Sequence, residues 1–193
     1  MKKSSILILI IICLVGCKKG SNETTITGEI KGLGTDTLYL YGMDELYDRI
    51  DTIYVENDKF SYTTSVDTIT SAYLLLKNRI EYPVFLDKGN KIKIKGDTIN
   101  LNFLTISGNI YNEEFTDFQK ALEDPADPSE KAGEETVDKR ITVEKANTAE
   151  EMAEEFILQH HSSYVSLYLL DKYFVQKETP DFSKIKKLVE VMT

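Results

Sequence analysis

The chain has 193 residues, a formal net charge of −9 and two cysteines. This length suits one domain, or two small ones, with a sizeable core. The acidic balance argues against nucleic acid or an anionic lipid surface as a direct partner, and it is typical of a solvated, soluble surface.

A lipoprotein signal peptide is predicted at the N-terminus. Two lysines precede an apolar run over 6–15, which is too short to span a bilayer as a mature helix. The run ends in Leu14-Val15-Gly16-Cys17, which resembles the lipobox of bacterial lipoproteins. The resemblance implies that residues 1–16 are a signal peptide and that Cys17 is lipidated after cleavage. A plain secretory signal that is followed by a cysteine is the alternative.

The same segment predicts where the protein lies. Residues 17–23 are polar, offer nothing to bury and would form a tether between the lipid and the fold. Family-level signals for export to the cell surface place acidic residues just after the cysteine, whereas Lys18 and Lys19 are basic. We therefore expect a cell-envelope lipoprotein that is held on the outer membrane through Cys17 and faces the periplasm.

Cysteine usage excludes thiol chemistry in the predicted mature chain. Cys13 would leave with the signal peptide, and Cys17 would carry the lipid. The mature domain would then have no disulfide, no redox thiol and no cysteine-based metal site.

From residue 25 to about 107 the hydrophobic period is two, which predicts strands. Strands are expected near 26–30, 37–41, 72–77, 82–86, 91–95 and 101–107, with a hairpin over 50–64. Asn57-Asp58 is the turn of this hairpin, and Pro83 favours an edge strand. Short strands separated by turn residues indicate an antiparallel β-sandwich or barrel-like domain over 24–108.

The period changes to three and four after Asn109, which predicts a helical segment over 109–193 and an α+β fold. An amphipathic helix is expected over 110–123, and two prolines end it. Residues 129–147 are highly charged and only weakly helical in pattern, whereas Thr148 and Glu151 form a capping box that would open the next helix. A helix over 164–174 is apolar nearly all round.

The last predicted helix carries an apolar stripe that needs a covering surface. Its members are Phe182, Ile185, Val189 and Met192, with Leu188 beside them. A helix of about three turns is marginal in water unless it buries such a face. We expect these C-terminal helices to pack back on the sheet, or to contact a protein partner or a second copy.

Six stretches carry a resemblance to a known family. They are ITGEIKGL, DTLYLY, IDTIYVENDKFSY, YPVFLDKGNKIKIKGD, ISGNIYNEEFTDFQ and FILQHHSSYVSLYLLDKYF. Together they resemble the N-terminal region of certain bacterial lipoproteins. In that family a β-rich domain of unknown function and a helical segment precede a thioredoxin-like domain of the peroxiredoxin and thiol–disulfide interchange type.

The sequence lacks the catalytic motif of this family. The family's thioredoxin-like domain carries Cys-x-x-Cys, which occurs nowhere in this chain. No catalytic residue is therefore assigned, and we do not expect an enzyme unless the chain is a fragment of a longer thioredoxin-like protein. A stand-alone relative of the N-terminal module is the other interpretation.

Tyr39 and Tyr41 are the candidate binding surface. They lie on one face of the strand over 37–41, opposite Leu38 and Leu40, so both rings would lie outside if the leucines enter the core. Such rings offer an amphipathic platform for a glycan or a protein. The alternative is that tyrosine merely suits half-buried strands.

No metal or cofactor site is predicted. His160 and His161 are adjacent, so on a helix they point about 100° apart and cannot share one metal in the usual i, i+4 manner. An acidic cluster lacks the spacing of a calcium loop and indicates a solvated loop. Its members are Asp124, Asp127, Glu130, Glu134 and Glu135.

These observations predict a lipid-anchored, non-enzymatic module for interaction or positioning. It would resemble the accessory part of thioredoxin-like lipoproteins. The alternatives are a part of, or docking module for, a thiol–disulfide oxidoreductase, and a glycan- or ligand-binding lipoprotein that uses the tyrosines.

Overall fold

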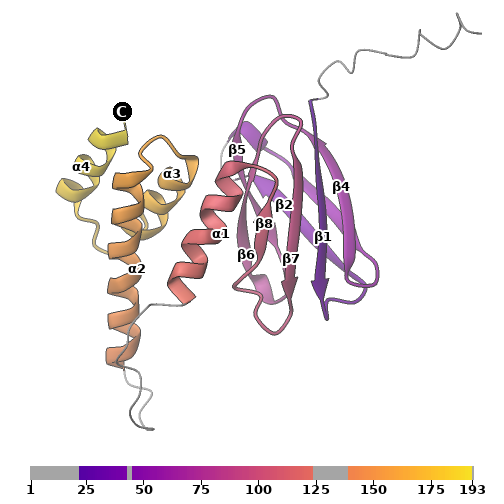
Figure 1. Ribbon diagram of the computed structural model, residues 1–193, viewed down its shortest axis with the longest axis horizontal. Helices are drawn as coiled ribbons and strands as arrows, with labels where there is room; N and C mark the ends of the chain where they lie inside the picture. Colours follow the sequence, from indigo (N-terminus) through magenta and orange to yellow (C-terminus); the bar gives the residue numbers. More distant parts are fainter. Residues whose placement is uncertain (1–21, 43–44, 124–138, 193) are drawn as a thin grey trace, which may run out of the picture.

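Two four-stranded sheets pack face to face, and the helices lie at one side of them (Figure 1). The computed structural model describes residues 22–42, 45–123 and 139–192. Within this part of the chain the predicted α+β fold is confirmed: strands come first and helices follow. The predicted signal peptide, Cys17 and the acidic cluster between 124 and 135 lie outside the described residues.

Sheet A has the strand order β4-β1-β7-β8, and sheet B has the order β3-β2-β5-β6. Sheet A consists of β1 (Glu23–Lys31), β4 (Lys59–Ser65), β7 (Lys91–Asp97) and β8 (Thr105–Ser107). Sheet B consists of β2 (Asp36–Gly42), β3 (Ile50–Val55), β5 (Thr70–Leu75) and β6 (Glu81–Leu86). Alternate side chains of both sheets enter one core, whose fully buried members include Ile26, Ile30, Leu38, Leu40 and Ile92.

One pair of strands departs from the antiparallel arrangement. β1 and β7 are parallel, with Thr25 opposite Lys91. The chain passes through sheet B between these two strands, so no tight turn forces them to run in opposite directions.

The local predictions for turns and edges are confirmed. Asn57 and Asp58 have φ values of 51° and 68°, as a two-residue turn between β3 and β4 requires. β6, which contains Pro83, is an edge strand of sheet B. Gly28 of β1 lies under the ring of Phe60, where any Cβ would collide with it.

Helix α1 (Ile110–Glu123) has the predicted bounds and covers the edge where β6 and β8 lie (Figure 1). Its side chains bond directly to the backbone of both edge strands. The Asn112 amide both accepts from and donates to the backbone of Phe85 in β6, and the Thr116 hydroxyl does the same for Ile106 in β8. One helix therefore caps both sheets at this side.

The helices that follow differ from the prediction in their boundaries. α2 (Lys139–Gln159) begins nine residues before Thr148, so the predicted capping box at Thr148 is wrong and this residue lies inside the helix. The charged residues before it are mostly long, unbranched side chains that favour helix. α3 (Tyr164–Leu170) begins after Ser163, whose hydroxyl accepts from the Val165 N–H, and a π-helical turn (Asp171–Val175) replaces its predicted last turn.

Helix α4 (Phe182–Met192) buries a different line of residues from the one predicted. Leu188 is buried, and Ile185 and Met192 are partly buried against the core. Phe182 is 77% exposed and Val189 is 41% exposed, so the stripe is rotated toward Leu188. Ion pairs from Lys184 to Glu150 and Glu154 of α2 help to fix this rotation.

Two 3₁₀ turns complete the described fold, one at Glu45–Tyr47 and one at Lys77–Arg79. None of the described helices is both long enough and apolar enough to cross a membrane.

Candidate functional site: the tyrosine face of sheet B

The structure places both predicted tyrosines on the outer face of sheet B. Leu38 and Leu40 are fully buried in the core, so the alternate residues of β2 point outward. Tyr39 is 41% exposed, and Tyr41 is half-buried. The predicted orientation of the two rings is therefore confirmed; their use as a binding surface stays a prediction.

Neighbouring strands add residues that the sequence reasoning did not include. Ile50 of β3 and Tyr73 of β5 lie opposite Tyr41 on its two sides, and Leu75 lies opposite Tyr39. Tyr54 of β3 lies opposite Thr37. We call the outward set the tyrosine face; it consists of Tyr39, Tyr41, Ile50, Tyr54, Tyr73 and Leu75.

Two rings of this face lie close together. The Tyr41 and Tyr73 ring centroids lie 5.7 Å apart, in a tilted arrangement. Ile50 and Tyr54 are each 73% exposed, which is unusual for large apolar side chains on a sheet. Because exposed apolar side chains that gather on one face are typical of interaction sites, the tyrosine face is the candidate binding surface.

The helices close one end of the tyrosine face and leave the other open. Phe85, on the same outer face of β6, is fully buried because its ring meets Tyr111 and Phe115 of α1 and Tyr168 of α3. β3, at the opposite side of sheet B, carries the most exposed members, Ile50 and Tyr54. The open end is therefore the half formed by β3 and β2.

The phenols of Tyr41 and Tyr73, the two half-buried tyrosines of this face, stay neutral because their pKa values are raised. Burial raises the pKa of Tyr41 above its usual value, and a hydrogen bond with Glu81 raises it further. Burial likewise raises the pKa of Tyr73, with smaller contributions from the charges of Glu81 and Asp171. A neutral phenol can donate a hydrogen bond at neutral pH but is poorly suited to act as a base.

The two histidines have local packing partners. The His160 ring stacks on Phe156 at a centroid distance of 4.2 Å, and its Nδ1 lies 3.2 Å from the Phe156 carbonyl oxygen. His161 Nδ1 lies 3.1 Å from the Ser162 hydroxyl. In the described ranges, no group of three or more histidine, cysteine, aspartate or glutamate side chains is arranged to hold a metal ion.

A cluster of polar side chains lies where β3 and β4 meet, and its hydrogen bonds hold these two strands together. Asp51 accepts hydrogen bonds from the Tyr47 hydroxyl and from Arg49 Nε, the latter at 3.1 Å. The Arg49 guanidinium also donates to Thr64 and to the Ser65 carbonyl, and it lies 4.6 Å from the centroid of the Tyr47 ring. These bonds join the two sheets at the side opposite α1.

Comparison with known proteins supports only the β-rich part of the predicted resemblance. No curated protein matches the chain, and no comparison links it to thioredoxin-like proteins. Residues 24–115, which span the sandwich and α1 as far as Phe115, match the family model described as a domain of unknown function (DUF4369).

Proposed function

We propose that this chain is a non-catalytic module of the cell envelope that binds a protein partner through the tyrosine face. The observation that carries the proposal is the exposure of Tyr39, Ile50 and Tyr54 on one open sheet face. Aromatic side chains on a rigid, hydrogen-bonded sheet lose little conformational freedom on binding, and such residues dominate protein interfaces.

The chemistry of the face favours a protein over a small-molecule substrate. Its phenols and aliphatic side chains offer burial and hydrogen bonds, but no activated nucleophile. Ile50 and Leu75 flank the rings of the face, and aliphatic side chains suit the core of a protein interface.

The cell-envelope location rests on the lipobox that ends at Cys17. Two or more acyl chains hold a protein stably on a membrane, because each buried methylene contributes about 0.8 kcal/mol. Intact-mass analysis of membrane-extracted protein should show a diacyl or triacyl adduct on Cys17. Processing and fractionation of Cys17→Ser protein like the wild type would contradict anchoring.

The C-terminal helix offers a second surface for the same role. Phe182, Val189 and Val191 of α4 are 77%, 41% and 42% exposed. We propose that a partner or a second copy covers them. Sedimentation over a concentration series should detect self-association, and Phe182→Ser should weaken it; a monomer at every concentration would exclude the second copy.

Redox docking is the alternative role for the module. The chain itself should be inert in thiol–disulfide exchange, since a form without Cys17 would offer no thiol outside the predicted signal peptide. Insulin reduction by that form, with contaminating thioredoxin excluded, would overturn the non-catalytic proposal.

Site-specific photo-crosslinking in intact cells tests the tyrosine face. A photoreactive residue at Tyr39 or Tyr54 should give one protein adduct, which the same residue at the exposed Ile99 should not give. Tyr54→Ser should weaken the Tyr39 adduct. The absence of an adduct, or its equal formation at Ile99, would overturn the proposal. A glycosidase-sensitive adduct would identify a glycan instead.

A further inference from the structure

The outer face of sheet A, on the other side of the sandwich, gathers five lysines. β7 contributes three at alternate positions, and β1 and β4 contribute one each. All five side chains are exposed. We call this set the lysine face; it consists of Lys31, Lys59, Lys91, Lys93 and Lys95.

The strand register sets the spacing of these charges. Lys91, Lys93 and Lys95 follow one another at two-residue steps, which on a strand is about 7 Å. Lys95 lies beside Glu29 of β1, and Glu29 lies beside Lys59 of β4 on its other side. Three of the lysines therefore form a row along β7, and Lys59 lies across the sheet from this row, on β4.

The five lysines form no ion pair with the residues that the structure describes. Across 22–42, 45–123 and 139–192, none of the five ammonium groups forms an ion pair with another described residue. Protection of an exposed sheet edge does not explain the row, because β7 is an interior strand between β1 and β8. In a chain of net charge −9, this gathering of unpaired positive charge is a local exception.

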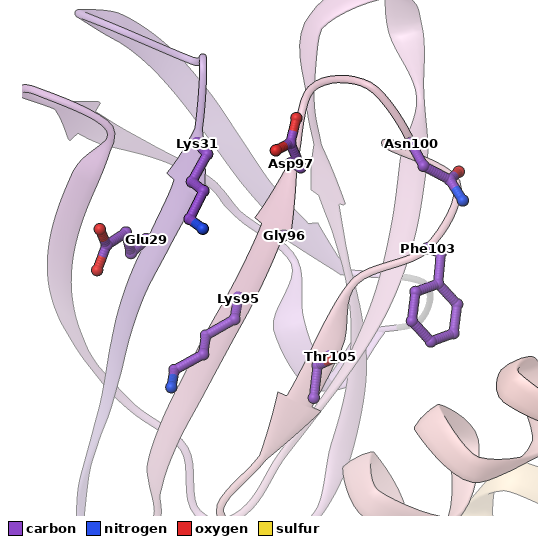
Figure 2. A pocket seen from close by; sticks show the side chains of 8 residues that line it. All are labelled: Glu29, Lys31, Lys95, Gly96, Asp97, Asn100, Phe103 and Thr105. Atoms are coloured by element: carbon purple, nitrogen blue, oxygen red, sulfur yellow. The ribbon is translucent and has the colours of Figure 1, made fainter.

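The face is hollowed rather than flat. An open depression of about 500 Å³ is lined by two lysines, Lys31 and Lys95, two carboxylates, Glu29 and Asp97, and by Asn100, Phe103 and Thr105. A second, of about 310 Å³, adjoins it and shares Glu29 and Lys95. In Figure 2 the lysines stand on β1 and β7 at one side of the larger depression, and the Phe103 ring and the Asn100 amide stand at the other.

We propose that the lysine face binds an anionic polysaccharide of the carboxylated class. The cationic, aromatic and amide groups of the face each match a part of such a ligand, and the five lysines outnumber the Glu29 and Asp97 carboxylates beside them. The ammonium groups pair with carboxylates, and the Phe103 ring offers an apolar surface to a sugar ring. Asn100, Thr105 and the Glu29 carboxylate offer hydrogen bonds to sugar hydroxyls.

Two other polyanionic partners fit less well. A planar bilayer would touch only the tips of the lysines, and the four strands of sheet A present no large exposed apolar side chain to insert. Single-stranded nucleic acid is held through stacking on several aromatic rings, whereas these two depressions are lined by Phe103 and by Phe60, which is buried.

Binding of polygalacturonate by the purified protein tests the proposal. Polygalacturonate should bind at low salt, and its affinity should fall steeply as the salt concentration rises. Polygalacturonate whose carboxylates are methyl-esterified should not bind.

Lys91→Gln, Lys93→Gln and Lys95→Gln together should weaken binding at least about tenfold. The matched control combines Lys120→Gln, Lys186→Gln and Lys187→Gln, which remove the same charge from exposed positions on α1 and α4 and should leave affinity within about twofold. Circular dichroism verifies that both triple variants are folded.

Several outcomes would overturn the proposal. No binding of polygalacturonate, or an equal loss in both triple variants, would show that the face has no specific role. Stronger binding to single-stranded DNA, or to equimolar phosphatidylcholine and phosphatidylglycerol vesicles, would assign it to another partner. The proposal assumes the cell-envelope location but not the tyrosine face, so Tyr39→Ser with Tyr54→Ser should leave polygalacturonate binding unchanged. The two proposals can therefore fail separately.

Discussion

The side-chain amide of Asn112 occupies both backbone hydrogen-bonding groups of Phe85. Its Oδ1 accepts from the Phe85 N–H at 3.0 Å, and its Nδ2 donates to the Phe85 carbonyl oxygen at 2.8 Å. Phe85 belongs to the edge strand β6, so the amide takes the place that a further strand would occupy. Asn112 is 1% exposed, and water cannot readily substitute for it.

We predict that Asn112→Ala destabilises the protein by about 1–3 kcal/mol, because it leaves buried backbone groups of Phe85 unsatisfied. Urea unfolding of the purified protein measures the change. Asn102→Ala, at an exposed position in the turn before β8, is the control, and it should change the free energy of unfolding by no more than about 0.5 kcal/mol. A cost for Asn112→Ala as small as that of the control would show that the amide does not seal this edge.

Gly28→Ala should destabilise the sandwich by about 1–3 kcal/mol through overpacking. A Cβ at this position would lie 2.1 Å from the Cζ atom of the Phe60 ring. The double-mutant cycle with Phe60→Leu separates this collision from backbone effects, since leucine lacks the far end of the ring. Gly28→Ala should cost less in the Phe60→Leu background. An equal cost in both backgrounds would place the strain elsewhere.

Stability should fall at alkaline pH because several tyrosines ionise at a lower pH in the unfolded chain than in the folded protein. Burial raises the pKa of Tyr82 and Tyr168, and burial together with a hydrogen bond to Asp51 raises the pKa of Tyr62 to about 12. An unfolded tyrosine has a pKa of about 10. The stabilisation is therefore complete below about pH 10 and is lost as the pH rises toward the folded values.

Tyr168→Phe provides the matched variant for this pH dependence. It keeps the ring contacts with Phe85 and Phe115 and removes the ionisable group. The free energy of unfolding at neutral pH, measured in urea, should change by less than about 1.5 kcal/mol, as is usual for a volume-conserving swap. The loss of stability between about pH 10 and 12 should be smaller than in the wild type. An unchanged alkaline profile would contradict the role of Tyr168.

Glu150 should contribute a small, acid-sensitive stabilisation of the helical segment. Its carboxylate lies 2.7 Å from Lys177 Nζ and 3.5 Å from Lys184 Nζ, and the hydrogen bond from Lys177 is the main cause of its lowered pKa. A lowered folded pKa stabilises above the unfolded value near 4.5, and this is lost as the pH falls below it.

Because the lysines are partly exposed, we expect Glu150→Gln to cost no more than about 1 kcal/mol at pH 7. The difference from wild type should vanish near pH 3 in urea unfolding. Glu151→Gln, at an exposed position on the same helix, should show no such convergence. A difference for Glu150→Gln that persists at acid pH would mean that the side chain acts through packing rather than charge.

The sequence by itself determined the local features of this protein. Alternation in β2 and β7 decided which residues point inward, and the buried Leu38, Leu40, Ile92 and Ile94 confirm it. The hairpin turn at Asn57-Asp58 and the bounds of α1 were likewise readable, because each depends on periodicity or turn chemistry within a few residues. The start of α2 could not be predicted, because the charged stretch before Thr148 has little hydrophobic periodicity.

Only the tertiary structure decided which distant residues share a surface. The parallel pairing of β1 with β7, and the neighbours of Tyr41 on β3 and β5, depend on packing summed over the whole core rather than on any local pattern. The tertiary structure likewise decides where charges of one sign gather. A total of −9 argues against nucleic acid or an anionic lipid surface as a partner, yet strand register gathers Lys59, Lys93 and Lys95 on one face. Electrostatic recognition acts over about a Debye length, so the local arrangement of charge matters more than its sum.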